Sequence, residues 1–356
     1  QFRAFGGSHG GKTEGRGQLG QRELVEVHIV FFDGIGFVFG GSAIKTPETG
    51  PRFNEIRTKR TRLAVGMRLR QAGRVNRESF TDAALVILGH GTILNDQSAA
   101  PVRQHAAELR RRNLFREVRE AFWKQEPQVK TVLAGLAAPR IFIVPMFISE
   151  GYFSTEIIPK ELGFSFPDNL KLKTKNSELS YCRPVGSHDL MTTVILARAK
   201  DVVERFPFPR APKPADTTLL IAGHGTGRNA NSRKAVERQV ALIRALKIFA
   251  DVRAVFMEEE PFIKGCPETV ATKHIVVVPF FISDGLHVAE DIPVLLGEPA
   301  RIVQQRLAAG QPTWRNPTEK SGKLIWYSPS VGDEPLLADV ILERVRESSS
   351  SSSSSS

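Results

Sequence analysis

The stretch Leu219-Leu-Ile-Ala-Gly-His-Gly-Thr226 closely repeats an earlier stretch of the same chain, Leu85-Val-Ile-Leu-Gly-His-Gly-Thr92. Outward from these two stretches, a shift of 134 residues places residues 83–163 on residues 217–297 without a gap. Of these 81 aligned positions, 31 are identical. Identity at this level over a fixed offset predicts that the chain contains two copies of one structural unit.

Each copy alternates short apolar runs of strand length with longer amphipathic segments, a pattern typical of βαβ units around a parallel sheet. The sequence therefore predicts an α/β fold: a tandem repeat of two doubly wound parallel-sheet domains that face each other across a cleft. In the first copy we expect strands near residues 84–88, 118–122, 141–147 and 180–184, and helices near 98–112, 128–138, 154–162 and 188–205. In the second copy we expect strands near residues 218–222, 252–256, 275–281 and 324–328.

The repeat also predicts where the domains begin and end. Residues 81–206 form the first repeat and residues 217–347 the second, joined by a Pro-rich linker at residues 207–216. Beyond Gly163 the offset between the copies grows to 146, which a 12-residue insertion around residues 301–320 explains. The basic, Gly- and Arg-rich residues 1–80 are expected to be poorly ordered, and the serines of residues 348–356 to form a low-complexity tail.

The charge distribution argues against a nucleic-acid partner. The net charge is +11, but residues 1–80 hold 14 Lys and Arg against 7 Asp and Glu, a net of +7, which leaves only +4 for the rest. The basic run Arg110-Arg-Arg112 has no aromatic platform beside it and is interpreted as the solvent face of a helix. The sequence contains no run of about 18 apolar residues and no signal-peptide pattern, so we expect a cytoplasmic protein without membrane contact.

Two features that suggest other chemistry are interpreted as incidental. The stretch Gly6-Gly-Ser-His-Gly-Gly-Lys-Thr13 fits the phosphate-loop pattern, but it lacks the buried strand before it and the helix after it that a nucleotide site needs. Cys182 and Cys266 are isolated, with no CxxC pair to suggest a structural zinc site, and are interpreted as semi-buried thiols.

Histidines lie at the carboxyl ends of predicted strands, where α/β proteins usually bind their ligands. His90 and His224 each follow the first strand of a copy, between glycines that allow a sharp turn or the close approach of a ligand. In the second copy His287 follows the third strand, whereas the first copy has Phe153 at that place. A neutral imidazole binds borderline metal ions. Because a catalytic pair is needed only once, we place the complete site in the second copy.

Carboxylates lie near the predicted pair. Glu258, Glu259 and Glu260 follow the second strand of the second copy, and Glu290 and Asp291 follow His287 by about one helical turn. Each of them alone is as well explained as a solvated charge or as decoration of a helix end. Together they offer proton acceptors beside the histidines. Only Glu260 and Glu290 have acidic counterparts in the first copy, namely Glu126 and Glu156.

The Gly-His-Gly-Thr motif, followed by Val278-Pro-Phe-Phe-Ile-Ser-Asp-Gly-Leu-His-Val-Ala-Glu-Asp-Ile-Pro293, resembles the sirohydrochlorin chelatases of the CbiX type. These belong to the ATP-independent chelatases, a class that also contains ferrochelatase. The resemblance covers residues 217–347 fully and residues 83–205 in framework, with a departure at Phe153. It implies that His224 and His287 bind the metal and catalyse its insertion, with no nucleotide and no cofactor beyond the metal substrate.

The resemblance further implies Co²⁺ or Fe²⁺ as the metal and sirohydrochlorin or a related tetrapyrrole as the organic substrate. Glu258 and Glu290 are candidates for passing pyrrole protons outward. Cobalt is preferred on family grounds only, because histidines do not define a metal. The alternatives are a sirohaem ferrochelatase, a non-catalytic tetrapyrrole- or metal-binding protein, and an α/β protein whose histidines are structural. Because one chain supplies both halves of the cleft, we expect a monomer.

Overall fold

In the computed structural model the chain divides into two units, Gln1–Pro51 and Arg52–Ser356. In the first unit, β1 (Val30–Phe32) pairs with β2 (Ile35–Phe37) in an antiparallel ladder. The phosphate-loop pattern at residues 6–13 and most of the 1–80 extension lie outside the described residues. The structure describes residues 30–32, 35–37, 80–92, 98–168, 170–226 and 230–350.

The second unit contains two five-stranded sheets with one topology. The strand order is β4-β3-β5-β7-β6 in the first repeat and β9-β8-β10-β12-β11 in the second, and only the last strand of each runs antiparallel. The first sheet comprises β3 (Phe80–Gly89), β4 (Phe115–Phe122), β5 (Arg140–Pro145), β6 (Lys171–Lys173) and β7 (Glu178–Tyr181). The second comprises β8 (Thr217–Gly223), β9 (Asp251–Phe256), β10 (His274–Pro279), β11 (Thr318–Lys320) and β12 (Lys323–Tyr327).

The four parallel strands of each sheet overlap the predicted positions, which confirms the α/β class and the repeat. Every residue of β8 is buried, and so are residues 83–89 of β3, as expected for parallel strands covered on both faces. The antiparallel edge strands β6 and β11 were not predicted. Each is only three residues long and mostly polar, so it lacks the apolar run on which a strand prediction depends.

Helices cover both faces of each sheet. The first repeat has α2 (Ala100–Arg112), α3 (Val129–Ala134), the π-helical turn η1 (Phe153–Ile157), α4 (Ile158–Leu162), the 3₁₀ turn η2 (Val185–Ser187) and α5 (Met191–Arg205). The second has α6 (Asn231–Leu246), α7 (Cys266–Thr269), the π-helical turn η4 (His287–Asp291), α8 (Ile292–Leu295), α9 (Ala300–Ala308) and α10 (Leu337–Ser350), after a 3₁₀ turn η3 (Pro214–Asp216) in the linker. Helix α9 lies within the predicted insertion.

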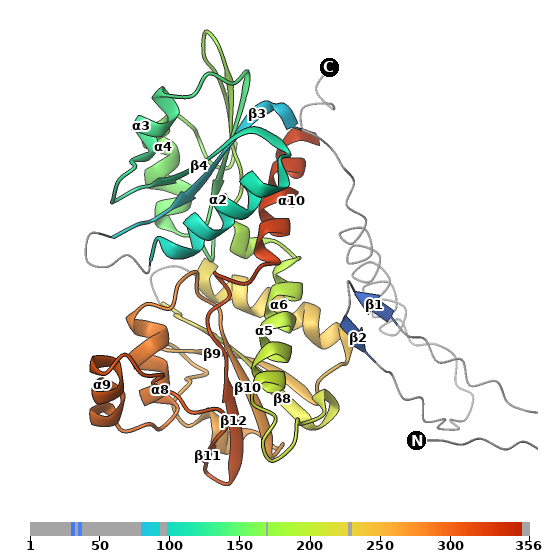
Figure 1. The fold of residues 1–356 in the computed structure, drawn as a ribbon. Coiled ribbons are helices and arrows are strands. Elements are labelled where there is room, and N and C mark those ends of the chain that lie inside the picture. The colour runs from blue at the N-terminus through green and yellow to red at the C-terminus, as the bar shows by residue number, and fades with distance from the viewer. Residues whose placement is uncertain are drawn as a thin grey trace, which may run out of the picture. The chain divides into compact units, whose positions relative to one another are not determined.

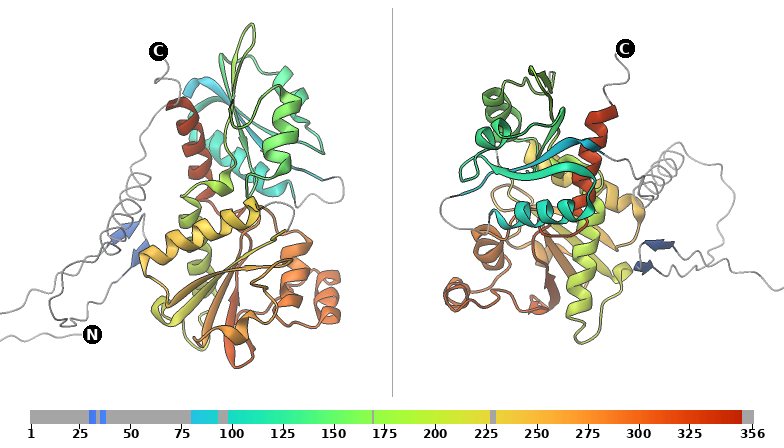
Figure 2. Two further views of the ribbon diagram at one scale, coloured as in Figure 1. Left: turned by 180° about the vertical axis from the view of Figure 1, so that it is seen from behind. Right: turned by 45° about the horizontal axis from the view of Figure 1, so that its top comes forward.

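The last helix of each repeat packs on the other repeat. Helix α5 lies against β10, β12 and α6 of the second repeat, and α10 lies against β5, α2 and η2 of the first, as Figure 1 shows. The two repeats thus exchange their last helices, and the views in Figure 2 show the same arrangement. The Trp326 indole N–H donates to the Phe206 carbonyl at 2.8 Å, and the Arg344 guanidinium donates to the Pro184 carbonyl. The two sheets are therefore parts of one interlocked body.

A close backbone approach supports the carboxyl edge of each sheet. A Cβ atom on Gly332 would lie 1.6 Å from the Ile282 carbonyl oxygen, and one on Gly186 would lie 2.0 Å from that of Ile148. Only glycine fits at such a contact. The Gly332 carbonyl in turn accepts a hydrogen bond from His105 Nε2 at 2.7 Å, which joins α2 of the first repeat to the second.

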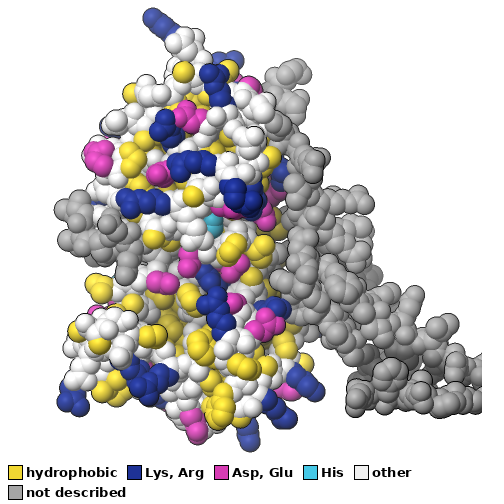
Figure 3. Space-filling view, in the orientation of Figure 1, with side chains coloured by type: hydrophobic (Ala, Val, Ile, Leu, Met, Phe, Trp, Pro, Cys, Tyr) yellow, Lys and Arg dark blue, Asp and Glu magenta, His cyan; other side chains and the backbone are white. Residues whose placement is uncertain are grey.

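The charged surface of the described part is mixed. In Figure 3 the Lys and Arg side chains are scattered among acidic and apolar ones. Arg110 pairs with Glu120, and Arg111 and Arg112 pair with Glu108, so the basic run is balanced as a helix surface. No helix in the described part is long and apolar enough to span a membrane. Cys182 and Cys266 are both buried, and burial raises the pKa of the Cys182 thiol to about 12.

Candidate metal and tetrapyrrole site

His224 lies directly after β8, where the chain turns sharply. Gly225 has a φ of +69°, and a Cβ there would lie 2.6 Å from the Glu259 side chain, so the position needs glycine. The His224 Nδ1 is 2.7 Å from the Gly225 carbonyl oxygen. Because a carbonyl only accepts, Nδ1 carries the hydrogen and Nε2 keeps a lone pair for a metal ion.

His287 is the first residue of η4, which follows the loop after β10. Its Nδ1 is 2.7 Å from Asp291 Oδ2, one turn further along, so the carboxylate accepts the Nδ1 hydrogen. A carboxylate behind an imidazole fixes its tautomer and orients the ring, as in many metal sites. Here too Nε2 keeps its lone pair. Asp291 was noted in the sequence but not selected, although its i,i+4 spacing from His287 is the signal that could have identified it.

A buried tyrosine fixes η4 on the sheet. The Tyr327 hydroxyl, at the end of β12, donates to the Val288 carbonyl at 2.7 Å, next to His287. Burial raises the pKa of Tyr327, which keeps the hydroxyl protonated as a donor. Its counterpart Tyr181 makes the same bond to the Ser154 carbonyl at 2.9 Å. Sequence reasoning did not identify either tyrosine, since a single apolar-flanked Tyr gives no signal of its partner.

The structure brings the predicted histidine pair together. The ring centroids of His224 and His287 lie 4.9 Å apart with an interplanar angle of 80°. The two side chains are 35% and 50% exposed, so a metal ion from solvent can reach them. Two imidazoles with free Nε2 atoms form a partial set of ligands, and among the described residues no three His, Cys, Asp or Glu side chains form a complete one. An incomplete set of ligands suits an ion that is bound only temporarily and then released.

The three consecutive glutamates differ in their environment. Glu258 Oε1 lies 3.7 Å from His224 Nε2, on the side of the ring that carries the lone pair. Glu259 instead accepts from the Thr226 backbone N–H at 3.3 Å and from Arg233 Nε at 3.1 Å. Arg233 also donates to the Glu260 carbonyl. Glu258 is therefore the glutamate that lies beside His224, whereas Glu259 connects its own loop to the Thr226 turn and to Arg233.

Glu290 points away from the pair. Its Oε1 accepts a 3.4 Å hydrogen bond from Gln304 Nε2, on helix α9 of the insertion. No described contact joins Glu290 to His224 or His287. Its predicted role in proton transfer is not tested by this arrangement and stays a prediction.

The first repeat keeps the framework of this site and changes its functional side chains. His90 Nδ1 lies 2.8 Å from the Gly91 carbonyl oxygen, as in the second repeat. Phe153 takes the place of His287, with its ring centroid 5.1 Å from that of His90. Lys124 takes the place of Glu258 and lies over the Phe153 ring at 5.5 Å. The carboxyl edge of the first sheet is therefore basic and aromatic, whereas that of the second sheet is acidic and rich in histidine.

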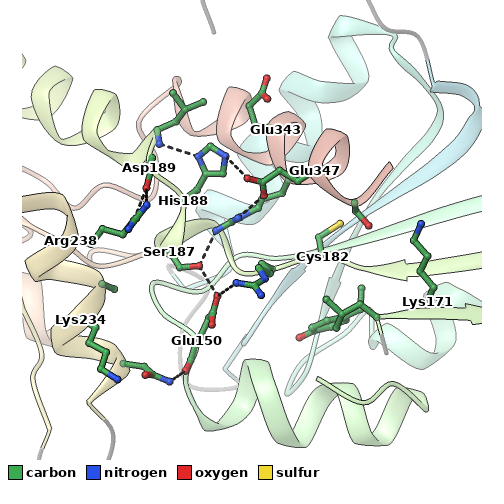
Figure 4. A pocket seen from close by; sticks show the side chains of 18 residues that line it. Glu150, Lys171, Cys182, Ser187, His188, Asp189, Lys234, Arg238, Glu343 and Glu347 are labelled. Carbon is green, nitrogen blue, oxygen red and sulfur yellow. Dashed lines mark hydrogen bonds and ion pairs between the residues drawn. The ribbon is translucent and has the colours of Figure 1, made fainter. Parts of the chain in front are cut away.

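A separate cavity of about 970 Å³ lies between the repeats, shown in Figure 4. Its walls come from β7, η2, α6 and α10, and neither His224 nor His287 lines it. Within it His188 Nε2 lies 3.3 Å from Glu347, and Arg238 pairs with Asp189. These two ion pairs link the exchanged helices to the repeat on which they pack.

Comparison with known proteins identifies the family to which both repeats belong. The CbiX family model matches residues 84–202 and again residues 218–348. The chain is 41% identical over 278 residues to a probable sirohydrochlorin cobaltochelatase of Halobacterium salinarum, covering 74% of this chain and 91% of that protein. The chain belongs to the CbiX family. The two matched segments agree with the two sheets, so the family unit occurs twice.

Other relatives define the extent of the similarity. The sirohydrochlorin cobaltochelatase of Methanopyrus kandleri is 26% identical over 149 residues, which cover 94% of that protein but only 36% of this one. The crystal structure of the multi-domain protein DR2241 from Deinococcus radiodurans, described as similar to chelatases, has a TM-score of 0.61 and 29% identity. That match covers 75% of this CbiX chain and 55% of DR2241, so this chain spans about half of that protein.

Proposed function

We propose that this chain is a sirohydrochlorin chelatase that inserts a divalent metal ion, with cobalt as the preferred metal. The observation that carries the proposal is the pair formed by His224 and His287, whose rings lie 4.9 Å apart. Hydrogen bonds from both Nδ1 atoms orient the rings so that both Nε2 atoms are available. The named activity of the Halobacterium salinarum relative agrees with this chemistry.

Metal insertion requires that an ion is held, delivered to the macrocycle and exchanged for two pyrrole protons. The two imidazoles hold the ion through neutral nitrogen, a ligand type suited to Co²⁺ and Fe²⁺. Glu258, 3.7 Å from His224 Nε2 and 57% exposed, is placed to take a proton and release it to solvent. Asp291 supports His287 from behind and keeps the ring oriented while the ion leaves.

Three finer points belong to the proposal. Cobalt over iron rests on the named activity of the relatives, since the imidazole pair suits both metals. The reaction uses no ATP, because neutral imidazoles and carboxylates supply what metal exchange requires. The protein acts as a monomer, because one chain carries two copies of a unit that the Methanopyrus kandleri relative carries once. Solution scattering that gives a dimer mass would contradict this last point. The expected cytoplasmic location stays a prediction.

The decisive experiment measures metal insertion into sirohydrochlorin by the change in absorbance, with Co²⁺ and Fe²⁺ supplied separately and no nucleotide. We expect His224→Ala and His287→Ala each to lower the rate by more than about 100-fold, because each removes a ligand. His90→Ala, the matched control in the first repeat, should leave the rate within about twofold of wild type. Tight macrocycle or metal binding without insertion would instead identify a non-catalytic binding protein.

A further inference from the structure

The first repeat replaces each chemical group of the metal site by one of different character. Lys124 stands where the second repeat has Glu258, and Phe153 stands where it has His287. Tyr152 replaces Leu286, and Ile157 replaces Asp291. The charge at the edge of the sheet is thus reversed, and the imidazole is exchanged for an aromatic hydrocarbon.

The residues of this edge are exposed rather than absorbed into a core. Tyr152 is 54% exposed, Phe153 is 37% exposed, and their ring centroids lie 5.9 Å apart at an angle of 67°. They are two of the six large apolar side chains that are exposed in the described part of the chain. Apolar side chains gathered at one edge usually indicate a binding surface. Loss of a metal ligand alone would not require two exposed aromatic side chains at this edge.

Lys124 adds a positive charge to the same edge. Its backbone N–H donates to the His90 carbonyl at 2.9 Å, which fixes the residue beside the strand end. Its ammonium lies 5.5 Å from the centre of the Phe153 ring, a cation–π distance. The exposed ammonium is therefore held at the margin of the aromatic pair, within reach of an anionic group on a molecule lying there.

The two edges belong to the same inter-repeat region. Asn231, in the first turn of α6 after the His224 loop, donates to the Glu150 carbonyl at 2.7 Å. Glu150 precedes Tyr152 by two residues in the loop after β5. The carboxyl ends of β3 and β8 both point toward the opposite repeat, as Figure 1 shows. A ligand large enough to reach both edges would therefore contact the histidine pair and the aromatic pair.

We propose that Lys124, Tyr152 and Phe153, here called the aromatic edge, bind the tetrapyrrole while the second repeat holds the metal ion. The rings of Tyr152 and Phe153 contact the π-face of the macrocycle, and Lys124 pairs with one of its peripheral carboxylates. The proposal rests on the proposed function, and it assigns different substrates to the two repeats: the polyanionic macrocycle to the first, the cation to the second.

The test measures the binding of metal-free sirohydrochlorin by quenching of tryptophan fluorescence, separately from turnover. The variants are Lys124→Glu, Tyr152→Ala and Phe153→Ala in the full chain. All three side chains are exposed, so folding should be preserved, and circular dichroism checks it. The matched control is Lys213→Glu, the same change of charge at an exposed lysine before β8, at the opposite end of a sheet.

We expect Lys124→Glu and Phe153→Ala each to weaken macrocycle binding at least about tenfold. Co²⁺ affinity should stay within about twofold of wild type, KM should rise, and kcat at saturating macrocycle should change little. Unchanged macrocycle affinity in both variants, with Lys213→Glu also unchanged, would overturn the aromatic edge. Wild type that binds the macrocycle but inserts no metal would overturn the proposed function alone. Wild type that does not bind the macrocycle at all would overturn both.

Discussion

The carboxyl edges of the two sheets share one framework and carry different chemistry. In both, a Gly-His-Gly-Thr turn follows the first strand and a π-helical turn follows the third. In both, a buried tyrosine bonds that π-helical turn, through Tyr181 in one and Tyr327 in the other. In the second repeat the framework presents His287, and in the first it presents Phe153. The geometry of the framework has thus been kept twice, whereas the histidine pair that we propose as the metal site occurs only once.

Even the hydrogen bonds that close the turns are matched. The Thr226 backbone N–H donates to Glu259, and the Thr92 backbone N–H donates to Gln125 at 2.9 Å. An amide replaces a carboxylate because only an acceptor oxygen is needed there. Because the same backbone N–H keeps an acceptor oxygen in both repeats, this hydrogen bond serves the fold of the turn.

The largest effect on stability is expected at two matched glycines, where the backbones of the two repeats are most alike. Gly332→Ala and Gly186→Ala each place a Cβ within about 2 Å of a backbone carbonyl oxygen, which must shift. We expect both to lower the free energy of unfolding by about 3 kcal/mol or more. Urea denaturation measures this loss. A large loss for one glycine and none for the other would show that the two frameworks are not equivalent.

The next prediction converts one edge into the other. The triple variant Lys124→Glu, Phe153→His, Ile157→Asp gives the first repeat the groups of the second on a framework that already positions His90. We expect it to bind a second equivalent of Co²⁺ where wild type binds one, as measured by isothermal titration calorimetry. A stoichiometry of one in the variant would mean that more than these three side chains distinguishes the repeats.

A smaller effect should separate support of the site from support of the fold. Tyr327→Phe and Tyr181→Phe each remove one buried hydrogen bond and should each cost about 1 kcal/mol in unfolding free energy. Only Tyr327→Phe should also weaken Co²⁺ binding, by a few-fold, because only its partner segment carries a proposed metal ligand, His287. Equal metal affinity in the two variants would contradict a positioning role for Tyr327.

The smallest expected effect depends on pH. Burial lowers the pKa of His105 from its ordinary 6.5, so the folded protein holds this imidazole neutral while the unfolded chain can protonate it. His105 should therefore contribute its full stability above pH 6.5 and lose it as the pH falls below that value. The aligned residue in the second repeat is Gln239, which likewise donates to the other repeat, at the His188 carbonyl, over 3.0 Å.

His105→Gln, which copies the second repeat, should flatten the dependence of the unfolding free energy on pH below about pH 6.5. The slope is obtained from urea midpoints at several pH values. An unchanged slope in the variant would assign the acid sensitivity to other groups.

Much of this protein was determined by sequence alone, because the decisive signals are local or repeated. Apolar runs identified the parallel strands, and the offset of 134 residues identified the tandem unit. Histidines at strand ends were correctly expected to meet, since the carboxyl ends of parallel strands share one edge. His224 and His287 lie side by side although 63 residues separate them.

Features that depend on contacts between distant segments could be determined only from the tertiary structure. Nothing in the sequence indicates that α5 and α10 pack on each other's repeat, because an amphipathic helix fits either apolar sheet face equally well. Similarly, Glu258, Glu259 and Glu290 are equivalent carboxylates in the sequence, and only the folded chain places one beside His224, one under a turn and one against α9. Sequence periodicity defines elements and their faces, but the partner of a polar side chain is set by packing.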